Sequence, residues 1–351
     1  MADGSRPPLS VLDLAIVSEG SEPGDALRNS VELVSHVERL GYTRHWVAEH
    51  HNMPGIASSA PAVLVAALAA ATSEIRVGSG GVMLPNHAPL VVAEQFGTLM
   101  GLHPGRIDLG IGRAPGTDMH TAAALRRTAD PLSVEDFPRH LTELIAFFDD
   151  SFPPGHPYGR ITATPGKGDR PEIWLLGSSD YGAQAAGVLG LPYAFAAHFS
   201  PRSLMPALEI YHSSFRPSAW LEEPRAMVAL AVICAEDDER ARWLAGPARL
   251  SFARLREGRP TRFPTPEEAA EHEFTPQQEA TVSAVQGSAV IGGPDKVRER
   301  LLEFAERTGA DELMLTTMVF DHADRLRSYE LVAEAMELAP RAEDPGALIR
   351  K

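Results

Sequence analysis

The amino-acid sequence predicts a single (β/α)8 barrel. Eight short apolar runs alternate with amphipathic stretches, a pattern typical of buried parallel strands separated by helices. The first apolar run leads into residues 17–20, which carry no glycine fingerprint, whereas a doubly wound nucleotide-binding sheet would more often show one there. The 351 residues would allow two domains by length alone, but one α/β barrel also reaches this size. We therefore expect residues 1–351 to form one barrel domain.

Each predicted strand is short and mostly apolar, and glycine or proline often flanks it. The strands are expected at residues 10–17, 45–48, 75–83, 106–111, 172–176, 193–197, 226–233 and 312–316. Helical patterns lie between them at 26–40, 60–71, 89–102, 134–148, 183–189, 203–215, 236–256 and 294–308, with a last one at 323–338. Gly41, Gly190 and Gly309 each follow a helical pattern, as glycines that end helices do. Asp295 lies in a first helical turn, where an acid complements the helix dipole.

Two segments are too long for simple connections. Residues 151–170 are rich in proline and glycine, and residues 258–286 are polar with several prolines and glutamates. Long loops in compact domains often serve as lids or binding loops. The second segment is thus either a mobile lid or a solvated surface excursion.

Composition excludes several classes of function. The formal net charge is −15, which argues against a nucleic-acid partner and against an anionic membrane surface. Cys234 is the one cysteine, so the chain forms no internal disulfide, and we expect a small buried side chain there. Residues 1–8 are polar, and no stretch has the apolar length of a membrane span. We therefore expect a cytoplasmic protein.

The predicted strand ends carry the residues capable of chemistry. In a barrel of this class the active site lies at the C-terminal ends of the strands. A glycine pair at the end of the third strand leaves backbone bare and suits a flat cofactor. The candidates in chain order are His50 and His51 after the second strand, Gly80 and Gly81 in the third, Arg113 after the fourth, His198 and Phe199 after the sixth, and Met318 after the eighth.

Residues 177–182 have the features of an anion site. Backbone amides at a helix N-terminus point outward, and the hydroxyls of Ser178 and Ser179 stand beside them. Arg113 would add a fixed positive charge and a forked donor. Plain capping of the helix by serine is the alternative. The position after the fifth strand, with Arg113 after the fourth, favours phosphate, because barrels often hold phosphate in these loops.

The two adjacent histidines do not predict a metal site. Neighbouring residues on a strand point to opposite faces, and no acid at suitable spacing completes a ligand set for His50 and His51. Imidazole titrates near neutrality, so we expect His50 to act as a general acid or base. For His51, a solvated loop position is an equal alternative. No nucleophile arrangement stands out, and Cys234 is not placed at a predicted strand end.

These motifs resemble the luciferase-like flavin-dependent monooxygenase family, the bacterial luciferase superfamily. The resemblance is strongest in residues 46–116. Further matching motifs follow in the family's order and spacing along nearly the whole chain, apart from the two long segments. The matching stretches are 48–51, 77–85, 105–113, 177–179, 190–192 and 309–313.

The resemblance implies a TIM barrel that binds FMN at the strand ends. His50 would lie near the reactive edge of the flavin, and a non-prolyl cis peptide would join Gly80 to Gly81 beneath the ring. Other pocket positions would contact flavin or substrate. The phosphate would be held by Ser178, Ser179, Tyr181 and Gly182 with Arg113 as counter-charge, and the pocket candidates are His51, His198, Phe199 and Met318.

The implied activity is that of a two-component monooxygenase. Reduced FMN would come from a separate flavin reductase, and O2 would oxygenate a small organic substrate. Gly112 stands where light-emitting bacterial luciferase carries a reactive cysteine, so neither bioluminescence nor an aldehyde substrate is implied. The family often dimerises through helices in the region of 60–102, and we expect a homodimer. Two alternatives are a deazaflavin-dependent dehydrogenase or reductase of the same fold, and a non-catalytic flavin-binding protein.

Overall fold

Eight parallel strands close into a barrel in the computed structural model, which describes residues 6–114, 116–126 and 135–341. Six strands follow one another in chain order, and pairing of the sixth with the seventh closes the ring. The predicted (β/α)8 fold is therefore confirmed. The barrel strands are β1 (Leu9–Asp13), β2 (Arg44–Val47), β3 (Arg76–Met83), β4 (Ile107–Gly112), β5 (Glu172–Gly177), β6 (Tyr193–Ala196), β7 (Ala226–Cys234) and β9 (Glu312–Thr316).

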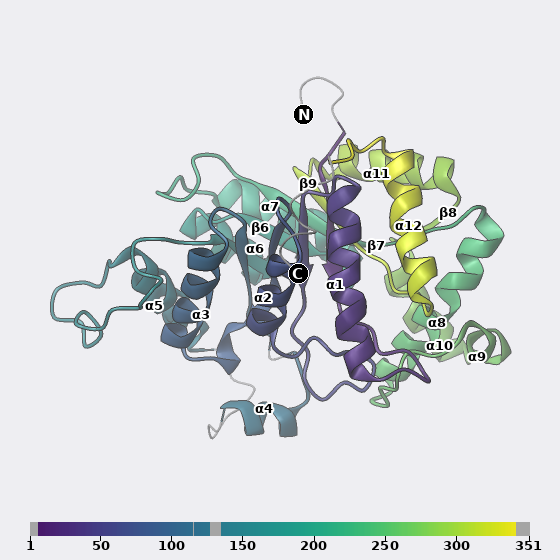
Figure 1. The fold of residues 1–351 in the computed structure, drawn as a ribbon, viewed down its shortest axis with the longest axis horizontal. Coiled ribbons are helices and arrows are strands. Elements are labelled where there is room, and N and C mark those ends of the chain that lie inside the picture. Colours follow the sequence, from purple (N-terminus) through teal and green to yellow (C-terminus); the bar gives the residue numbers. More distant parts are fainter. Residues whose placement is uncertain (1–5, 115, 127–134, 342–351) are drawn as a thin grey trace.

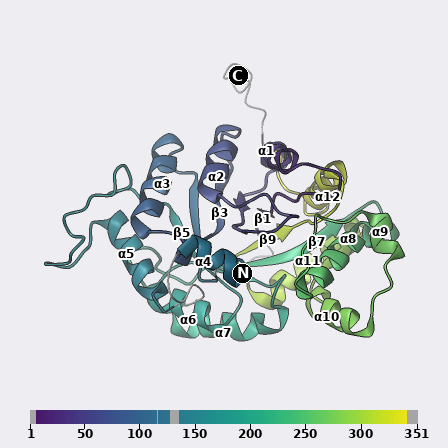
Figure 2. The same ribbon diagram turned by 90° about the horizontal axis from the view of Figure 1, so that it is seen from below.

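Helices surround the strands, as Figures 1 and 2 show from two directions. Each predicted helix is present: those at 89–102 and 294–308 have the predicted bounds, and the ends of the others are shifted by a few residues. Residue 134, where one was predicted to begin, lies outside the described residues. These helices are α1 (Pro23–Arg39), α2 (Pro61–Ala70), α3 (Pro89–Leu102), α5 (Phe137–Asp149), α6 (Asp180–Leu189), α7 (Leu204–Ser214), α8 (Asp238–Arg256), α11 (Pro294–Thr308) and α12 (His322–Ala335).

Strand β8 (Val290–Gly292) and helix α4 (Met119–Arg126) lie outside every predicted strand and helix. Strand β8 pairs only with the end of β7 and stays outside the closed ring. Helix α4 follows β4. It lies below the strands in Figure 1 and in front of the barrel in Figure 2, on the side of the strand ends. Both elements are too short for periodicity to reveal them.

The polar segment 258–286 is not a continuous loop, which corrects the expectation from its composition. It contains α9 (Pro266–Glu271) and α10 (Pro276–Gln286), and a threonine hydroxyl caps each helix. Phe263 exchanges backbone hydrogen bonds with residues 17 and 19, in the segment between β1 and α1, at 2.9 and 2.8 Å. Ion pairs to α8, such as Arg249 to Glu279 at 2.9 Å, fix the rest. Its role as a lid stays a prediction.

The helix ends follow the sequence signals. Gly41, Gly190 and Gly309 adopt left-handed backbone conformations with φ of +88°, +62° and +62°, which glycine adopts without steric cost. Cys234 is the last residue of β7 and is buried among core side chains, so the expectation that it stands away from a strand end is wrong. Burial raises the pKa of its thiol to about 12, as expected for an inert packed cysteine.

An ionic layer fills the N-terminal end of the barrel. Arg44 is 1% exposed and donates hydrogen bonds from Nη1 to Asp108 at 2.8 Å and from Nε to Glu312 at 2.7 Å. Burial opposes the charge on Arg44, but the two carboxylates outweigh this and raise its pKa. Trp46 donates to Asp108 at 2.9 Å and packs edge-on against Trp174 one level higher, with ring centroids 5.7 Å apart. This end of the barrel is therefore filled with paired charges and aromatic rings.

No helix within the described ranges is both long enough and apolar enough to cross a lipid bilayer.

Candidate functional site

A cavity of about 270 Å³ lies at the C-terminal ends of the strands. Residues from several strand ends line it, together with apolar side chains from inside the barrel. The predicted site residues that it brings together are His50, Gly80, Arg113, Ser178, Ser179, Tyr181, Gly182, His198 and Phe199. The strand ends thus bring together predicted site residues that lie up to about 150 positions apart in the sequence.

Three predicted residues are not among those that line the cavity. His51 turns away from it, and its Nε2 lies 2.9 Å from Glu49 Oε1. Met318 packs against the apolar cluster inside the barrel. Gly81 faces the barrel wall, where an added Cβ would lie 2.8 Å from the Gly110 carbonyl oxygen. His50 and His51 both lie beyond the end of β2 at Val47, where the alternation of a strand no longer fixes side-chain directions, and the contact with Glu49 holds His51 away from the cavity.

The sequence reasoning missed most of the apolar lining. Met227 and Met314 point into the barrel from β7 and β9, and Met83 and Phe137 contribute from the end of β3 and from α5. The two strand methionines could have been found, because each occupies an inward position in the two-residue alternation of its strand. Their flexible thioether chains suit a cavity of irregular shape.

The bond between Gly80 and Gly81 is cis, as the resemblance implied. The pairing register between β3 and β4 shifts at this point, from Gly80 opposite Gly110 to Val82 opposite Ile111. A Cβ on Gly80 would lie 2.9 Å from a Leu12 methyl carbon and 3.1 Å from Trp46. A side chain here would have to displace the Leu12 methyl group and press on Trp46, and glycine leaves bare backbone at the cavity wall.

Two neutral imidazoles face the cavity. Burial lowers the pKa of His50 to about 4, against the weaker opposing effect of the Glu49 carboxylate. Burial also lowers the pKa of His198 to about 4, although its Nδ1 donates a hydrogen bond to the Ala229 carbonyl at 3.4 Å. Both rings are uncharged at neutral pH, which corrects the expectation that His50 titrates near neutrality. Nδ1 of His50 is buried without a hydrogen-bond partner among the described residues.

One end of the cavity is suited to an anion. Ser179 is the N-cap of α6, yet its side chain makes no capping hydrogen bond. Plain capping, the alternative weighed from the sequence, is therefore not what this serine does. The Arg113 guanidinium lies 4.1 Å from the centre of the Tyr181 ring, and the described part of the chain gives it no carboxylate partner. Open amides, a hydroxyl and an arginine thus converge at this end.

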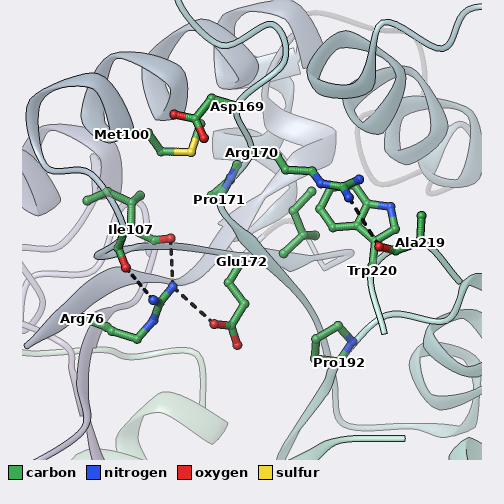
Figure 3. Close-up of a pocket in the computed structure, with 12 residues that line it drawn as sticks. Arg76, Met100, Ile107, Asp169, Arg170, Pro171, Glu172, Pro192, Ala219 and Trp220 are labelled. Atoms are coloured by element: carbon green, nitrogen blue, oxygen red, sulfur yellow. Dashed lines mark hydrogen bonds and ion pairs between the residues drawn. The ribbon is translucent and has the colours of Figure 1, made fainter. Parts of the chain in front are cut away.

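A second cavity, of about 340 Å³, lies near the N-terminal ends of β4 and β5 (Figure 3). Three of its charged groups, Arg76, Arg170 and Glu172, are paired with one another or with their surroundings. Arg76 lies 3.3 Å from Glu172, and the Arg170 guanidinium stacks 3.8 Å from the Trp220 ring. Because these groups are already partnered, and because the N-terminal face of a barrel serves stability, we assign this cavity no catalytic role.

Within residues 6–114, 116–126 and 135–341, no group of three or more histidine, cysteine, aspartate or glutamate side chains is placed to hold a metal ion.

Buried histidines make the free energy of unfolding depend on pH. His45, His50 and His198 have folded-state pKa values of about 4 instead of 6.5. The unfolded chain therefore binds more protons between these values, so their stabilisation is complete above pH 6.5 and declines as pH falls towards 4. His45, which is fully buried, contributes about 3 kcal/mol to this decline, at about 1.4 kcal/mol per pH unit.

Urea unfolding checks this expectation. The urea concentration at the unfolding midpoint of the wild-type protein should decrease as the pH is lowered from about 7 to about 5. In His45→Gln this decrease should be smaller. His212→Gln on α7 is the control, because His212 is exposed. Equal pH dependence in all three proteins would contradict the linkage.

Comparison with known proteins places the chain among monooxygenases. The sequence profile of the family described as luciferase-like monooxygenase matches residues 9–312. A protein of Escherichia coli strain K12 named luciferase-like monooxygenase is 46% identical over 328 residues, covering 93% of this chain and 96% of its own. The Bacillus subtilis strain 168 protein YvbT is 49% identical over 326 residues, with coverages of 93% and 96%.

A solved structure supports the same grouping. The crystal structure of apo-MsnO8 matches with a TM-score of 0.85 and 41% identity, over 96% of this chain and all of the other. The likeness spans the whole barrel, including the strand ends that form the cavity.

Proposed function

Because the chain belongs to the luciferase-like monooxygenase family, we propose that it is an FMN-dependent, two-component monooxygenase that oxygenates a small organic molecule. The observation that carries this proposal is a single apolar cavity with an anion-binding end, a bare glycine wall and a neutral histidine. The anion-binding end suits a phosphate, the glycine wall suits a flat ring, and the histidine suits a proton transfer.

The residues fit the cofactor. Ser178, Ser179, Tyr181 and the first amides of α6 would hold the phosphate, with Arg113 as its counter-charge. The backbone of Gly80, which lines the cavity without a side chain, would face the ring. Reduced FMN, when bound, supplies the electrons that activate O2.

The protein's own groups would protect and direct the reaction. The lining methionines, leucines and aromatic side chains are apolar and would exclude water once the cavity is occupied, which would strengthen polar interactions inside it. His50 enters the reaction neutral, so it can accept a proton on one ring nitrogen while the other donates a hydrogen bond. A separate reductase would deliver the reduced flavin.

The names of relatives support an organic substrate, and the choice between FMN and a deazaflavin is a matter for experiment. A 33% identical Bacillus subtilis protein is named N-acetyl-S-alkylcysteine monooxygenase, covering 95% of this chain and 99% of its own. At 18% identity, an oxygenating constituent of 3,6-diketocamphane monooxygenase shares the fold in complex with FMN. At 15%, an F420-dependent secondary alcohol dehydrogenase shares it with an F420–acetone adduct. These two structures support the fold alone.

Anaerobic titration tests the cofactor. The protein should bind reduced FMN at least about 10-fold more tightly than reduced riboflavin, because a charged phosphate contact contributes about 1.5–3 kcal/mol. Arg113→Ala should remove most of this preference while leaving riboflavin affinity unchanged. Arg216→Ala, at an exposed position, is the control. Equal affinity of the wild type for both flavins would contradict the phosphate site, and stabilisation by F420 instead of FMN would favour the deazaflavin alternative.

We also propose a homodimer formed through α2 and α3. Val63, Val91 and Leu102 project from these helices and are 71%, 45% and 66% exposed. Exposed apolar side chains on two neighbouring helices favour an interaction surface, and a second copy of the chain is the occupant expected here. Light scattering at micromolar concentration should give twice the monomer mass, and Val63→Asp should shift it to the monomer. A wild-type monomer would refute the dimer.

A further inference from the structure

A buried carboxylate lies at the centre of a hydrogen-bond network beside the cavity. Glu49 is 0% exposed. Its Oε1 accepts from Asn86 Nδ2 at 3.2 Å and lies 2.9 Å from His51 Nε2. Its Oε2 accepts from the Met83 backbone N–H at 3.0 Å, and His87 Nε2 lies 3.0 Å from both oxygens. Four donors therefore converge on one side chain.

The network requires an ionised carboxylate. Burial opposes ionisation, but hydrogen bonds from His51, His87 and Met83 outweigh it and lower the pKa of Glu49 to about 2. A carboxylate only accepts, so the two imidazoles must each carry a proton on Nε2. Glutamine has the same shape, but it would turn one acceptor into a donor facing these N–H groups.

The network joins three loops that build the cavity. Glu49 lies just after β2 and directly precedes His50. Met83 ends β3, three residues after Gly80, and η1 (Leu84–Asn86) follows it. His51 reaches the loop after β4, where the Thr117 hydroxyl donates to its carbonyl at 3.0 Å. That loop begins at Arg113, so one carboxylate connects the segments that carry the histidine, the glycine wall and the arginine.

We propose that Glu49 is a positioning residue for the flavin site, holding these three loops in the arrangement that presents His50, Gly80 and Arg113 to one cavity. Glu49 is not among the residues that line the cavity, so it acts through the groups it orients. This inference rests on the proposed function, because the affinity that it predicts is for reduced FMN.

The chain offers a matched control at the other end of the barrel. Glu38 Oε1 accepts from the backbone N–H groups of Ser73, Glu74 and Ile75 at 3.0, 2.7 and 2.9 Å. Glu38 stabilises the turn before β3, far from the C-terminal strand ends that form the cavity. Glu38→Gln therefore disturbs a comparable carboxylate network without touching the cavity loops.

The experiment compares Glu49→Gln with Glu38→Gln. Glu49→Gln should weaken reduced-FMN binding at least about 10-fold, equivalent to 1.4 kcal/mol, while Glu38→Gln should leave it within about twofold. Both should lower the melting temperature. His87→Gln, which removes one donor only, should weaken binding less and covers the case in which Glu49→Gln does not fold. Wild-type affinity in Glu49→Gln, or equal loss in the two glutamate variants, would overturn the proposal.

A cofactor-free measurement separates this inference from the proposed function. Nitrogen-15 spectra of the imidazoles should show His51 and His87 protonated on Nε2 in the wild type, and this pattern should be lost in Glu49→Gln. If the wild type bound no reduced FMN, the proposed function would fail while these spectra still reported on the network. Unchanged histidine spectra in Glu49→Gln would overturn the network itself.

Discussion

Replacement of His50 by glutamine is expected to lower kcat in a reductase-coupled assay by roughly 10²- to 10⁴-fold, the usual contribution of general acid–base catalysis. His50 lines the cavity, and its pKa of about 4 keeps the ring neutral at neutral pH. Glutamine can donate a hydrogen bond but cannot take up a proton. Turnover should therefore fall far more than the affinity for reduced FMN.

Comparing the loss of turnover with the loss of affinity for reduced FMN decides the role of His50. His212→Gln on α7 serves as the control for a general effect of removing a histidine, because His212 is exposed. The melting temperature of both variants should stay close to that of the wild type. An equal loss of turnover and flavin affinity in His50→Gln would show that His50 only positions the cofactor.

The second large effect is expected at the other end of the barrel. Arg44→Met should lower the free energy of unfolding by about 3–5 kcal/mol, the usual cost of breaking a buried ion pair by removing one partner. The substitution would leave Asp108 and Glu312, which are 0% and 2% exposed, without their shared guanidinium. The urea unfolding midpoint measures the loss.

A surface ion pair gives the matched control. Arg28 bonds Asp25 on α1 with 74% of its own side chain exposed, so Arg28→Met should change stability by no more than about 1 kcal/mol. Arg44→Lys keeps the charge but loses the forked donor geometry. Its loss in free energy of unfolding should lie between those of Arg44→Met and Arg28→Met. Equal midpoints for Arg44→Met and Arg28→Met would mean that the ionic layer does not stabilise the fold.

The barrel could be predicted because its strands are short apolar runs with a regular alternation of helices between them. The ionic layer could not, because Arg44, Asp108 and Glu312 lie far apart in the sequence and nothing in it shows that their side chains meet inside the barrel. The helices in 258–286 carried a signal that was passed over. Thr265-Pro266 and Thr275-Pro276 are the capping threonine and first-turn proline of typical helix starts.

Much of the candidate site followed from one rule, that the strand ends of a barrel converge. That rule placed His50, Arg113 and the serine turn in one cavity, although it gives no orientation for loop side chains. His51 and Met318 were therefore assigned to the cavity without lining it. Glu49 was not singled out, since a carboxylate beside a loop usually faces solvent, and only the fold reveals the donors around it.

The ionic layer at the N-terminal end of the barrel also restricts how molecules can enter and leave the cavity. Paired charges and two tryptophans fill the barrel interior towards its N-terminal end, which leaves the C-terminal strand ends as the side from which molecules would enter the cavity. If a cofactor and a substrate meet at His50 as proposed, they would share one approach. Any molecule seated first narrows the path for the next, so the order of arrival and departure would be determined by the sheet as much as by the loops above it.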